Sequence, residues 1–378
     1  MVETQFRNAR IVLAGEIVEG SLASRDGVIA AIDSGTAQTG EDLDGDYLIP
    51  GLVELHTDHL ENHYRPRPGV FWDAMASLHA HDVQIAGSGI TTVFDAVRIG
   101  SDLDMPEMRE HAGRLIGAVS EARNAGWLRA DHLIHLRCEL PSADVIDHFE
   151  SFVGHPTTRL ISLMDHTPGQ RQFTSLETYK LFYKKQLGVT QEEVERYLAA
   201  ALAQHERYAA PNRRHLVSRA RALNLAMASH DDATLAHVEE AVEDGVAIAE
   251  FPTTLEAAAA AHDAGLAILM GAPNVVRGKS HSGNISATDL VRAGLLDILS
   301  SDYVPFALLQ AAFVLPQRVD GLALPEALAT VTSNPARAAG LDDRGEIAIG
   351  KRADLVRVKV VGGLPIVRGV WRQGIRVS

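Results

Sequence analysis

Residues 47–69 read YLIPGLVELHTDHLENHYRPRPG, and they carry the clearest fold signal in the chain. A Pro-Gly turn is followed by closely spaced apolar residues, which predicts a buried strand over residues 52–59. Histidines, carboxylates and two arginines follow within a few residues of this strand. The pattern indicates a strand that enters a core and presents chemically active side chains where it ends.

Strands of this kind recur seven more times along the chain. The predicted ranges are 89–97, 131–140, 159–166, 224–232, 246–252, 266–273 and 296–303. Ala-rich segments with helix-favouring composition lie between them, which is the alternation expected of a parallel sheet with right-handed crossovers. Eight such units over about 250 residues predict an α/β fold of the (β/α)8 TIM-barrel class.

The two ends of the chain differ from this central span. Residues 3–47 and 345–378 consist of short β-branched runs separated by Gly, Asp and Asn, which is typical of hairpins. We therefore expect a small β-sandwich domain made of residues 1–48 plus 345–378, beside a barrel of residues 49–344.

Composition limits the classes of protein that this chain can belong to. Its 378 residues are 46% hydrophobic, enough for a large core, and its single cysteine, Cys138, excludes an internal disulfide. The net charge of −14 argues against general nucleic-acid binding. No stretch approaches the roughly 20 apolar residues of a membrane span, and the first residues do not resemble a signal peptide. We expect a cytoplasmic enzyme without nucleic-acid or membrane partners, and homo-oligomerisation stays open.

Side chains suited to metal binding stand at the ends of several predicted strands. His56 and Asp58 are two residues apart, so an extended strand end directs both to one face; His59 is the alternative to Asp58. Histidine nitrogens and carboxylate oxygens suit Zn²⁺, Mn and Fe. We expect one or two divalent transition-metal ions, with Zn²⁺ favoured. The predicted ligands are His56, Asp58, Glu139, His166 and His230, and Asp302 ends the eighth strand.

Other polar residues have less specific readings. His79, His132 and His135 are interpreted as hydrogen-bonded core histidines, because a lone strand histidine is more often structural than a ligand. His63, Asp165 and Asp231 are candidates for orienting the ligands. Glu250 fits either the site or a salt-bridged strand end.

Cationic residues near the same strand ends indicate an anionic small-molecule substrate. The candidate substrate-binding residues are His59, Arg65, Arg67, Arg277, Lys279, Ser280 and His281. Arginine forks bind phosphate oxygens in pairs, and Gly278 and Gly283 would let backbone N–H groups approach a phosphate. A solvated surface loop is the competing reading of 275–284. Lys180, Lys184 and Lys185 belong to a lid or to an ordinary exposed helix face.

Three motifs, IPGLVELHTDH, TSNPARAAGL (332–341) and GEIAIGKRADLV (345–356), make the chain resemble the metal-dependent amidohydrolase superfamily. MDHTPGQRQF, GAPNVVRGKSHSGN and SSDYVPFALL are similar to its phosphonate-utilisation branch, in the carbon–phosphorus lyase pathway. The resemblance implies hydrolysis of α-D-ribose 1-methylphosphonate 5-triphosphate, a phosphorylated sugar, to the 5-phosphate and pyrophosphate.

The resemblance also implies roles for two of the carboxylates. Asp302 matches the superfamily's last-strand aspartate, which takes the proton of the attacking water. Glu139 would replace the carboxylated lysine that bridges two metals in many members. Two alternatives are hydrolysis of a C–N or cyclic phosphate-ester bond, and a catalytically silent binding scaffold. The intact set of strand-end ligands counts against the scaffold.

Overall fold

The computed structural model describes residues 3–35, 37–101, 108–171, 190–278 and 284–378, and it contains all eight predicted barrel strands. They form one sheet in chain order, and a parallel bridge between Thr57 and Asp302 joins its first and last strands. The barrel is therefore nearly closed, as the sequence predicts. Its strands are β6 (Leu52–Thr57), β7 (Ile90–Ile99), β8 (Asp131–Glu139), β9 (Thr158–Met164), β10 (Ala226–His230), β11 (Ile248–Glu250), β12 (Ala267–Gly271) and β13 (Ile298–Ser300).

Helices connect the parallel strands, and threonine side chains cap the first turns of three of them, α6, α8 and α9. The side chains of Thr234 and Thr254 accept hydrogen bonds from the backbone N–H groups three residues later, which satisfies donors that a helix start leaves open. The helices between strands are α1 (His59–Tyr64), α2 (Ala74–Gly87), α3 (Met108–Asn124), α4 (Val145–Phe152), α6 (Gln191–Gln204), α7 (Ala210–Ala222), α8 (Leu235–Glu243), α9 (Leu255–Asp263), α10 (Ala272–Arg277) and α11 (Ala287–Arg292). A π-helical turn, His205–Ala209, joins α6 to α7, and α12 (Ala307–Arg318), α13 (Leu324–Ala329) and α14 (Ser333–Ala338) follow β13.

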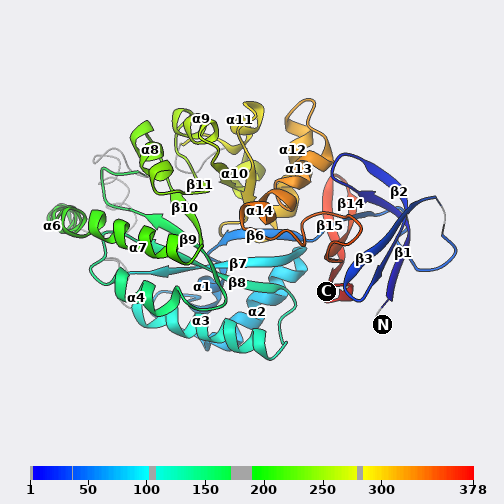
Figure 1. Cartoon of the computed structure of the whole chain (residues 1–378), viewed down its shortest axis with the longest axis horizontal. Helices are drawn as coiled ribbons and strands as arrows, with labels where there is room; N and C mark the ends of the chain where they lie inside the picture. Colours follow the sequence, from blue (N-terminus) through cyan, green and yellow to red (C-terminus); the bar gives the residue numbers. More distant parts are fainter. Residues whose placement is uncertain (1–2, 36, 102–107, 172–189, 279–283) are drawn as a thin grey trace. The chain divides into compact units, whose positions relative to one another are not determined.

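The two ends of the chain share a second sheet. The antiparallel pairing of β5 (Tyr47–Pro50) with β14 (Leu355–Val361) joins them, and Figure 1 shows both chain ends beside this sheet. Its core includes Phe6 and Trp371, whose rings meet edge to face at 4.7 Å. The prediction of a separate terminal β-structure is confirmed, and the boundaries at 48 and 345 stay a prediction. The remaining strands are β1 (Glu3–Val12), β2 (Ile17–Arg25), β3 (Val28–Ser34), β4 (Glu41–Asp42), β15 (Leu364–Arg372) and β16 (Ile375–Arg376).

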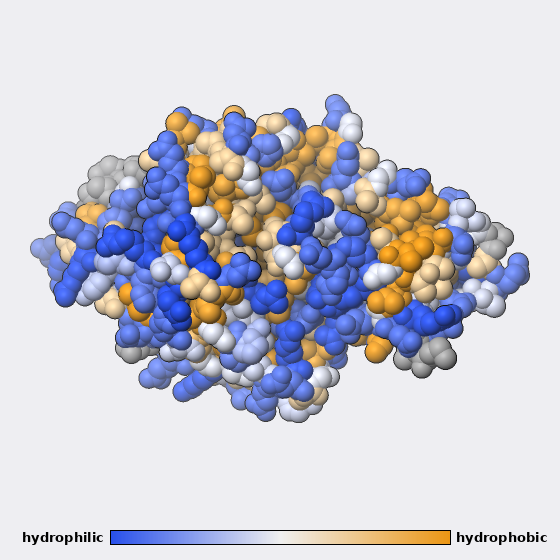
Figure 2. All heavy atoms as spheres, viewed as in Figure 1, coloured by the Kyte–Doolittle hydropathy of each residue, from blue (hydrophilic) through white to orange (hydrophobic). Residues whose placement is uncertain are grey.

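Hydrophobic side chains also reach the surface of the terminal sheet. Figure 2 shows them on the right of the view among hydrophilic residues. Exposed hydrophobic residues of the β14–β15 hairpin are Val360, Val361, Leu364 and Ile366. Within the described ranges, the protein has no helix with both the length and the apolar character of a membrane span.

The chain divides into two compact units. Unit 1 comprises Met1–Asp95, Ala118–Leu133 and Met270–Ser378, and it contains the terminal sheet, β6, α1, α2 and β13. Unit 2 comprises Ala96–Gly117 and Ile134–Leu269, and it contains β9, β10, β11 and the helices between them.

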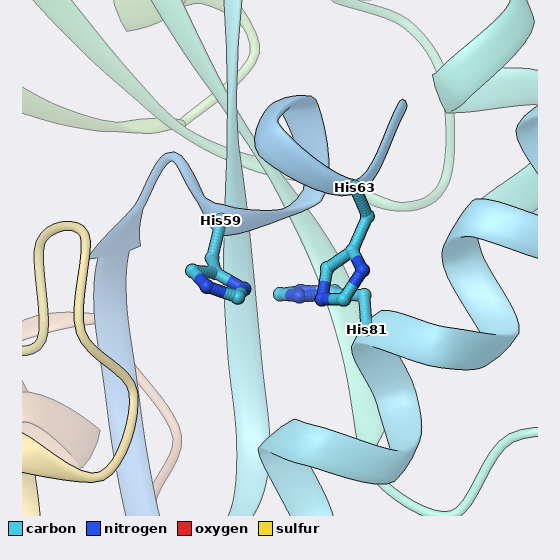
Figure 3. A group of neighbouring side chains, drawn as sticks. All are labelled: His59, His63 and His81. Atoms are coloured by element: carbon cyan, nitrogen blue, oxygen red, sulfur yellow. The ribbon is translucent and has the colours of Figure 1, made fainter. Parts of the chain in front are cut away.

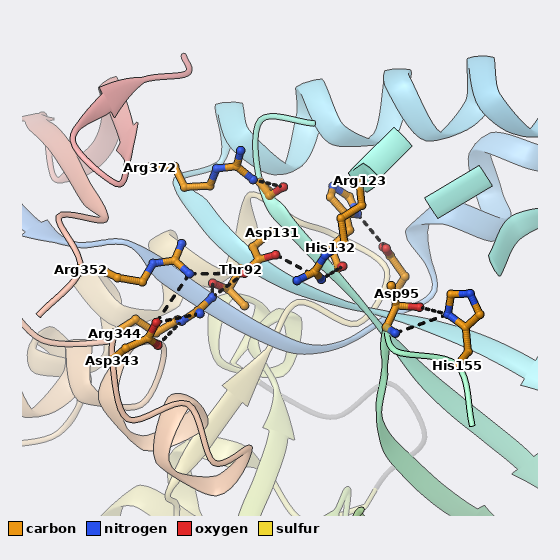
Figure 4. A network of polar contacts seen from close by, with 12 residues as sticks. Thr92, Asp95, Arg123, Asp131, His132, His155, Asp343, Arg344, Arg352 and Arg372 are labelled. Carbon is orange, nitrogen blue, oxygen red and sulfur yellow. Dashed lines mark hydrogen bonds and ion pairs between the residues drawn. The ribbon is translucent and has the colours of Figure 1, made fainter. Parts of the chain in front are cut away.

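An ionic cluster in unit 1 ties the C-terminal part of the chain to the start of β8. Asp131 lies 2.8 Å from Arg344, 3.3 Å from Arg123 and 3.4 Å from Arg352 (Figure 4). Burial raises the pKa of Asp131, but the hydrogen bond from Arg344 and the positive charges around it outweigh burial and lower that pKa. The cluster explains why residues 344–352, far away in sequence, belong to the same unit as the first residues of β8.

A second buried network runs between α2, β7 and β8 in the same unit. Asp95 lies 2.8 Å from His81 Nε2 and 2.7 Å from His132 Nδ1 (Figure 4 labels Asp95 and His132). Burial lowers the pKa of His132, but the carboxylates of Asp95 and Asp82 outweigh burial and raise that pKa to about 9. This prediction of a hydrogen-bonded core histidine at 132 is confirmed.

The raised pKa predicts a pH dependence of stability. A histidine whose folded pKa lies above its unfolded value of 6.5 contributes stability that is complete below that value and is lost as pH rises through about 9. In the presence of a chelator, the free energy of unfolding should fall between these pH values by on the order of 3 kcal/mol. Asparagine cannot titrate, so the free energy of unfolding of His132→Asn, measured by urea unfolding, should fall clearly less with rising pH. An equal fall in the two proteins would contradict the assignment.

Candidate active site

In unit 1, the start and the end of the barrel place three predicted site residues together. His56 and Asp58 lie at the end of β6, with His56 Nε2 at 3.6 Å from Asp58 Oδ1. Asp302 follows β13, and its backbone N–H donates to the His56 carbonyl at 3.2 Å. The Asp302 carbonyl in turn accepts from the backbone N–H of Asp58 and from Thr57 Oγ1. We call His56, Asp58 and Asp302 the β6–β13 group.

Glu54 holds the backbone of this group in place. Its carboxyl group is fully buried and accepts hydrogen bonds from the backbone N–H groups of His56 and Ser301. It therefore connects the two strand ends that carry the site residues. Burial raises the pKa of Glu54 to about 8, and the charge of Asp302 adds to that shift. Sequence reasoning did not single out Glu54, because a carboxylate that binds two backbone amides leaves no spacing signal.

The backbone at Asp302 is unusual for a residue with a side chain. Its φ is +55°, in the left-handed region that Asp and Asn adopt more readily than most residues. Asp231 shares this conformation, with φ of +56°. A Cβ added at Gly271, the last residue of β12, would lie 3.7 Å from Asp302 Oδ2. An alanine at 271 would therefore make only an ordinary van der Waals contact with the carboxylate. The positive φ of Asp302 is a form of backbone strain that is often found at functional sites.

In unit 2, the ends of β8, β9 and β10 place a second set of residues together. His166 Nδ1 lies 2.6 Å from Glu139 Oε2, and the His166 and His230 rings are 5.7 Å apart. Asp231 lies beside them, with Oδ2 at 3.6 Å from His230 Nε2. We call Glu139, His166, His230 and Asp231 the β8–β10 group.

Electrostatics in the β8–β10 group favour bound positive charge. Burial raises the pKa of Asp231 to about 7. Burial also raises the pKa of Glu139, but the charge and hydrogen bonds of His166 outweigh it and lower that pKa. His230 is oriented by Glu250, whose Oε2 lies 3.1 Å from His230 Nδ1. A cation between the side chains would stabilise both carboxylates in their charged form.

The donor set of the β8–β10 group fits a metal ion. One donor atom each from His166, His230 and Asp231 lies within 4.8 Å of the others, and all three come from strand ends. Asp231 Oδ2 is buried and accepts no hydrogen bond from the residues that the structure describes. A buried carboxylate oxygen of this kind is costly unless it binds a cation. Sequence reasoning treated Asp231 only as an orienting residue; its signal was its position next to His230 in SHDD.

The candidate substrate-binding residues that the structure describes lie in and just after the short helices α1 and α10. Arg65 ends α1, half-buried, and Arg67 is exposed in the turn that follows. Arg277 is exposed in the last turn of α10, which replaces the loop expected after β12. The reading of Gly278 as a phosphate-binding amide was wrong, because its N–H caps α10 by donating to the carbonyls of Asn274 and Val275. The candidates Lys279, Ser280, His281 and Gly283, and the lid lysines Lys180, Lys184 and Lys185, lie outside the described residues.

The other polar residues singled out in the sequence lie outside the two groups. His135 is a buried core histidine, with Nε2 at 2.8 Å from Ser162 Oγ, as predicted. His79 is only half-buried and lies 6.2 Å from the Trp127 ring. Asp165 pairs with His205, at 2.7 Å. His59 does not follow Asp58 towards His56; its ring lies 4.9 Å from that of His63.

A nearly closed parallel barrel with histidines and carboxylates at its strand ends, and with a sheet built from both termini, defines a class of hydrolytic enzymes. A family model for the amidohydrolase family matches residues 47–377. The chain belongs to the amidohydrolase family, and its resemblance to that superfamily is confirmed.

A curated relative is similar over almost the whole chain. It is the alpha-D-ribose 1-methylphosphonate 5-triphosphate diphosphatase of Escherichia coli strain K12, 46% identical over 98% of this chain and 99% of the relative. Solved structures with the same fold include N-acetylglucosamine-6-phosphate deacetylase from Pasteurella multocida, with a TM-score of 0.64 and 15% identity over 99% of each chain. Another is 5-methylcytosine deaminase from Klebsiella pneumoniae, with a TM-score of 0.65 and 15% identity over 99% of this chain and 98% of that one. At such identities these structures are evidence for the fold alone.

Proposed function

We propose that this enzyme hydrolyses α-D-ribose 1-methylphosphonate 5-triphosphate to the 5-phosphate and pyrophosphate. The observation that carries the proposal is the 46% identity to the Escherichia coli diphosphatase across 98% of the chain. Identity of this extent covers the barrel and the terminal sheet together, so it is not the similarity of one motif. The bond that breaks is the anhydride between the α- and β-phosphates, since pyrophosphate leaves intact.

We propose metal ligands in each unit: His56 and Asp58 in unit 1, and Glu139, His166 and His230 in unit 2, with Asp231 added from its position. Imidazole and carboxylate donors suit Zn²⁺, which we propose as the ion; Mn and Fe accept the same donors. A bound divalent ion would lower the pKa of water from about 16 towards about 7 and neutralise charge on phosphoryl oxygens.

The chain's own residues supply the other requirements. We propose that Asp302 accepts the proton of the attacking water, because a carboxylate next to His56 and Asp58 can receive it at neutral pH. We assign Glu54 a positioning role, since it holds the backbone of both strand ends. Arg65, Arg67 and Arg277, with Lys279, Ser280, His281 and His59, are proposed to bind the phosphates, where each charge-assisted hydrogen bond adds about 1.5–3 kcal/mol.

A charge-dependent substrate preference tests this proposal. Arg277→Ala should lower kcat/KM for the ribosyl triphosphate roughly ten- to a hundredfold, because it removes one charge-assisted phosphate contact. The same change should leave hydrolysis of an uncharged amide or ester surrogate, if any is measurable, nearly unchanged. Steady-state kinetics on both substrates would show the difference.

Arg292→Ala is the matched control for this experiment. Arg292 is also an exposed arginine in the last turn of a short helix, but it pairs with Asp289 at 2.9 Å. Its loss should leave kcat/KM for the triphosphate within about twofold, since exposed ion pairs contribute little. Equal losses in both variants would remove Arg277 from the substrate site. Efficient amide hydrolysis by the wild-type enzyme, with no turnover of the triphosphate, would reject the proposed substrate.

A further inference from the structure

A cluster of three histidines lies between α1 and α2. Two of them, His63 and His81, have no role in the proposed hydrolysis, and the third is His59. His59 and His63 come from α1, and His81 comes from α2 (Figure 3). One ring nitrogen from each lies within 4.8 Å of the others. The ring centroids are 4.9 Å apart for His59 and His63, 5.8 Å for His59 and His81, and 5.9 Å for His63 and His81. We propose that His59, His63 and His81 form a second site for a divalent transition metal.

The positions of these residues follow from the sequence. His59 and His63 are four residues apart, so on a helix they lie on the same face, one turn from each other. Two histidines at this spacing are a common helical metal-binding pair. His81 completes the set from the neighbouring helix, and Figure 3 shows its ring beside the other two. A metal ion here would join the short helix α1 to α2.

Hydrogen bonds already orient two of the three rings for this role. His81 Nε2 is 2.8 Å from Asp95 Oδ1, and His63 Nε2 is 3.2 Å from Gln84 Oε1. Ligating histidines usually donate their second ring N–H to a carboxylate or carbonyl group, which fixes the tautomer and directs the other nitrogen to the metal. In both residues the nitrogen left over is Nδ1.

The remaining nitrogens lack the partners that burial requires. His81 is fully buried, and its Nδ1 makes no hydrogen bond to any residue that the structure describes; the same holds for the buried Nδ1 of His59. A buried polar atom without a partner destabilises the folded protein, and a bound metal ion would remove that cost.

The chemistry of the donor atoms limits which metal ions the site would bind. Three imidazole nitrogens without a carboxylate suit Zn²⁺ or Co²⁺ better than Mg²⁺ or Ca²⁺, which prefer oxygen. Three protein ligands also leave a fourth position for water or another small ligand. The site is distinct from the β6–β13 group, because the Asp58 side chain lies towards His56 whereas the next residue, His59, lies towards α2.

Metal counting with matched variants tests the proposal. The full-length protein is stripped with a chelator, dialysed against Zn²⁺ and analysed by elemental mass spectrometry, and Co²⁺ titration follows the visible absorption of the bound ion. His63→Phe should bind one equivalent fewer than the wild type and lose the corresponding Co²⁺ absorption. His79→Phe, a change of the same kind on α2 outside the cluster, should match the wild type.

Each other result counts against the site. Equal metal content and equal Co²⁺ spectra in the wild type and His63→Phe would overturn it. A loss in His79→Phe as large as that in His63→Phe would also overturn it, since the effect would then reflect general damage to α2. Should His63→Phe misfold by circular dichroism, His63→Gln, which keeps a polar side chain towards Gln84, gives the same comparison.

Discussion

Asp302→Asn should lower kcat by roughly 10²–10⁴-fold, the range that a positioned proton acceptor contributes, while metal content and KM stay close to the wild type. The amide keeps the size of the carboxylate but cannot take up the proton of the attacking water. Asparagine also tolerates the left-handed backbone of residue 302, with φ of +55°, so the strand end should keep its geometry. Steady-state assays measure kcat and KM, and elemental analysis of the same preparation measures the metal content.

Asp44→Asn is the matched control for Asp302→Asn. Asp44 has nearly the same backbone conformation, with φ of +56°, but it lies exposed in the terminal sheet region. Its substitution should change neither kcat nor metal content. If Asp302→Asn turns over within a few-fold of the wild-type rate, Asp302 is not the proton acceptor. The assignment of the metal ligands would not change.

His230→Ala should lose bound metal and activity together. His230 is buried and is oriented by Glu250. One of its ring nitrogens lies within 4.8 Å of a donor atom of His166 and of Asp231. If the ion supplies about 4 kcal/mol of transition-state stabilisation, its loss lowers the rate by roughly 10³-fold. Elemental analysis should show at least one equivalent less than the wild type, with a native circular dichroism spectrum.

His262→Ala is the control for this second prediction, because His262 is an exposed histidine of the same unit, on α9. It should keep full metal content and full activity. His230→Asn, which keeps a polar group near Glu250, separates loss of a ligand from loss of packing. Full metal content in a folded His230→Ala protein would remove His230 from the ligand set.

The barrel could be predicted well because its signals are local. Each of the eight predicted strand ranges overlaps an observed strand, since buried parallel strands appear as apolar runs that the helical segments between them do not imitate. The terminal sheet was equally visible from its β-branched runs. The strand-end positions of His56, Glu139, His166, His230 and Asp302 followed, because parallel strands present their carboxyl ends at one edge.

What could not be predicted depends on tertiary packing. Glu54 was unremarkable in sequence, yet it binds the backbone at Ser301, 247 residues away. The approach of His81 to His59 and His63 requires the crossing of α2 over α1, which no spacing in the chain encodes. Gly278 was misread because a glycine after an apolar run signals a helix end as readily as a phosphate loop.

Phosphorus NMR of the products tests the central claim most directly. The metal-loaded wild-type enzyme is incubated with α-D-ribose 1-methylphosphonate 5-triphosphate, and the phosphorus signals are followed with time. The proposed function predicts that the triphosphate signals disappear while pyrophosphate and a sugar 5-phosphate appear in equal amounts, with the phosphonate signal retained. An unchanged triphosphate, or its conversion to orthophosphate without pyrophosphate, would contradict it.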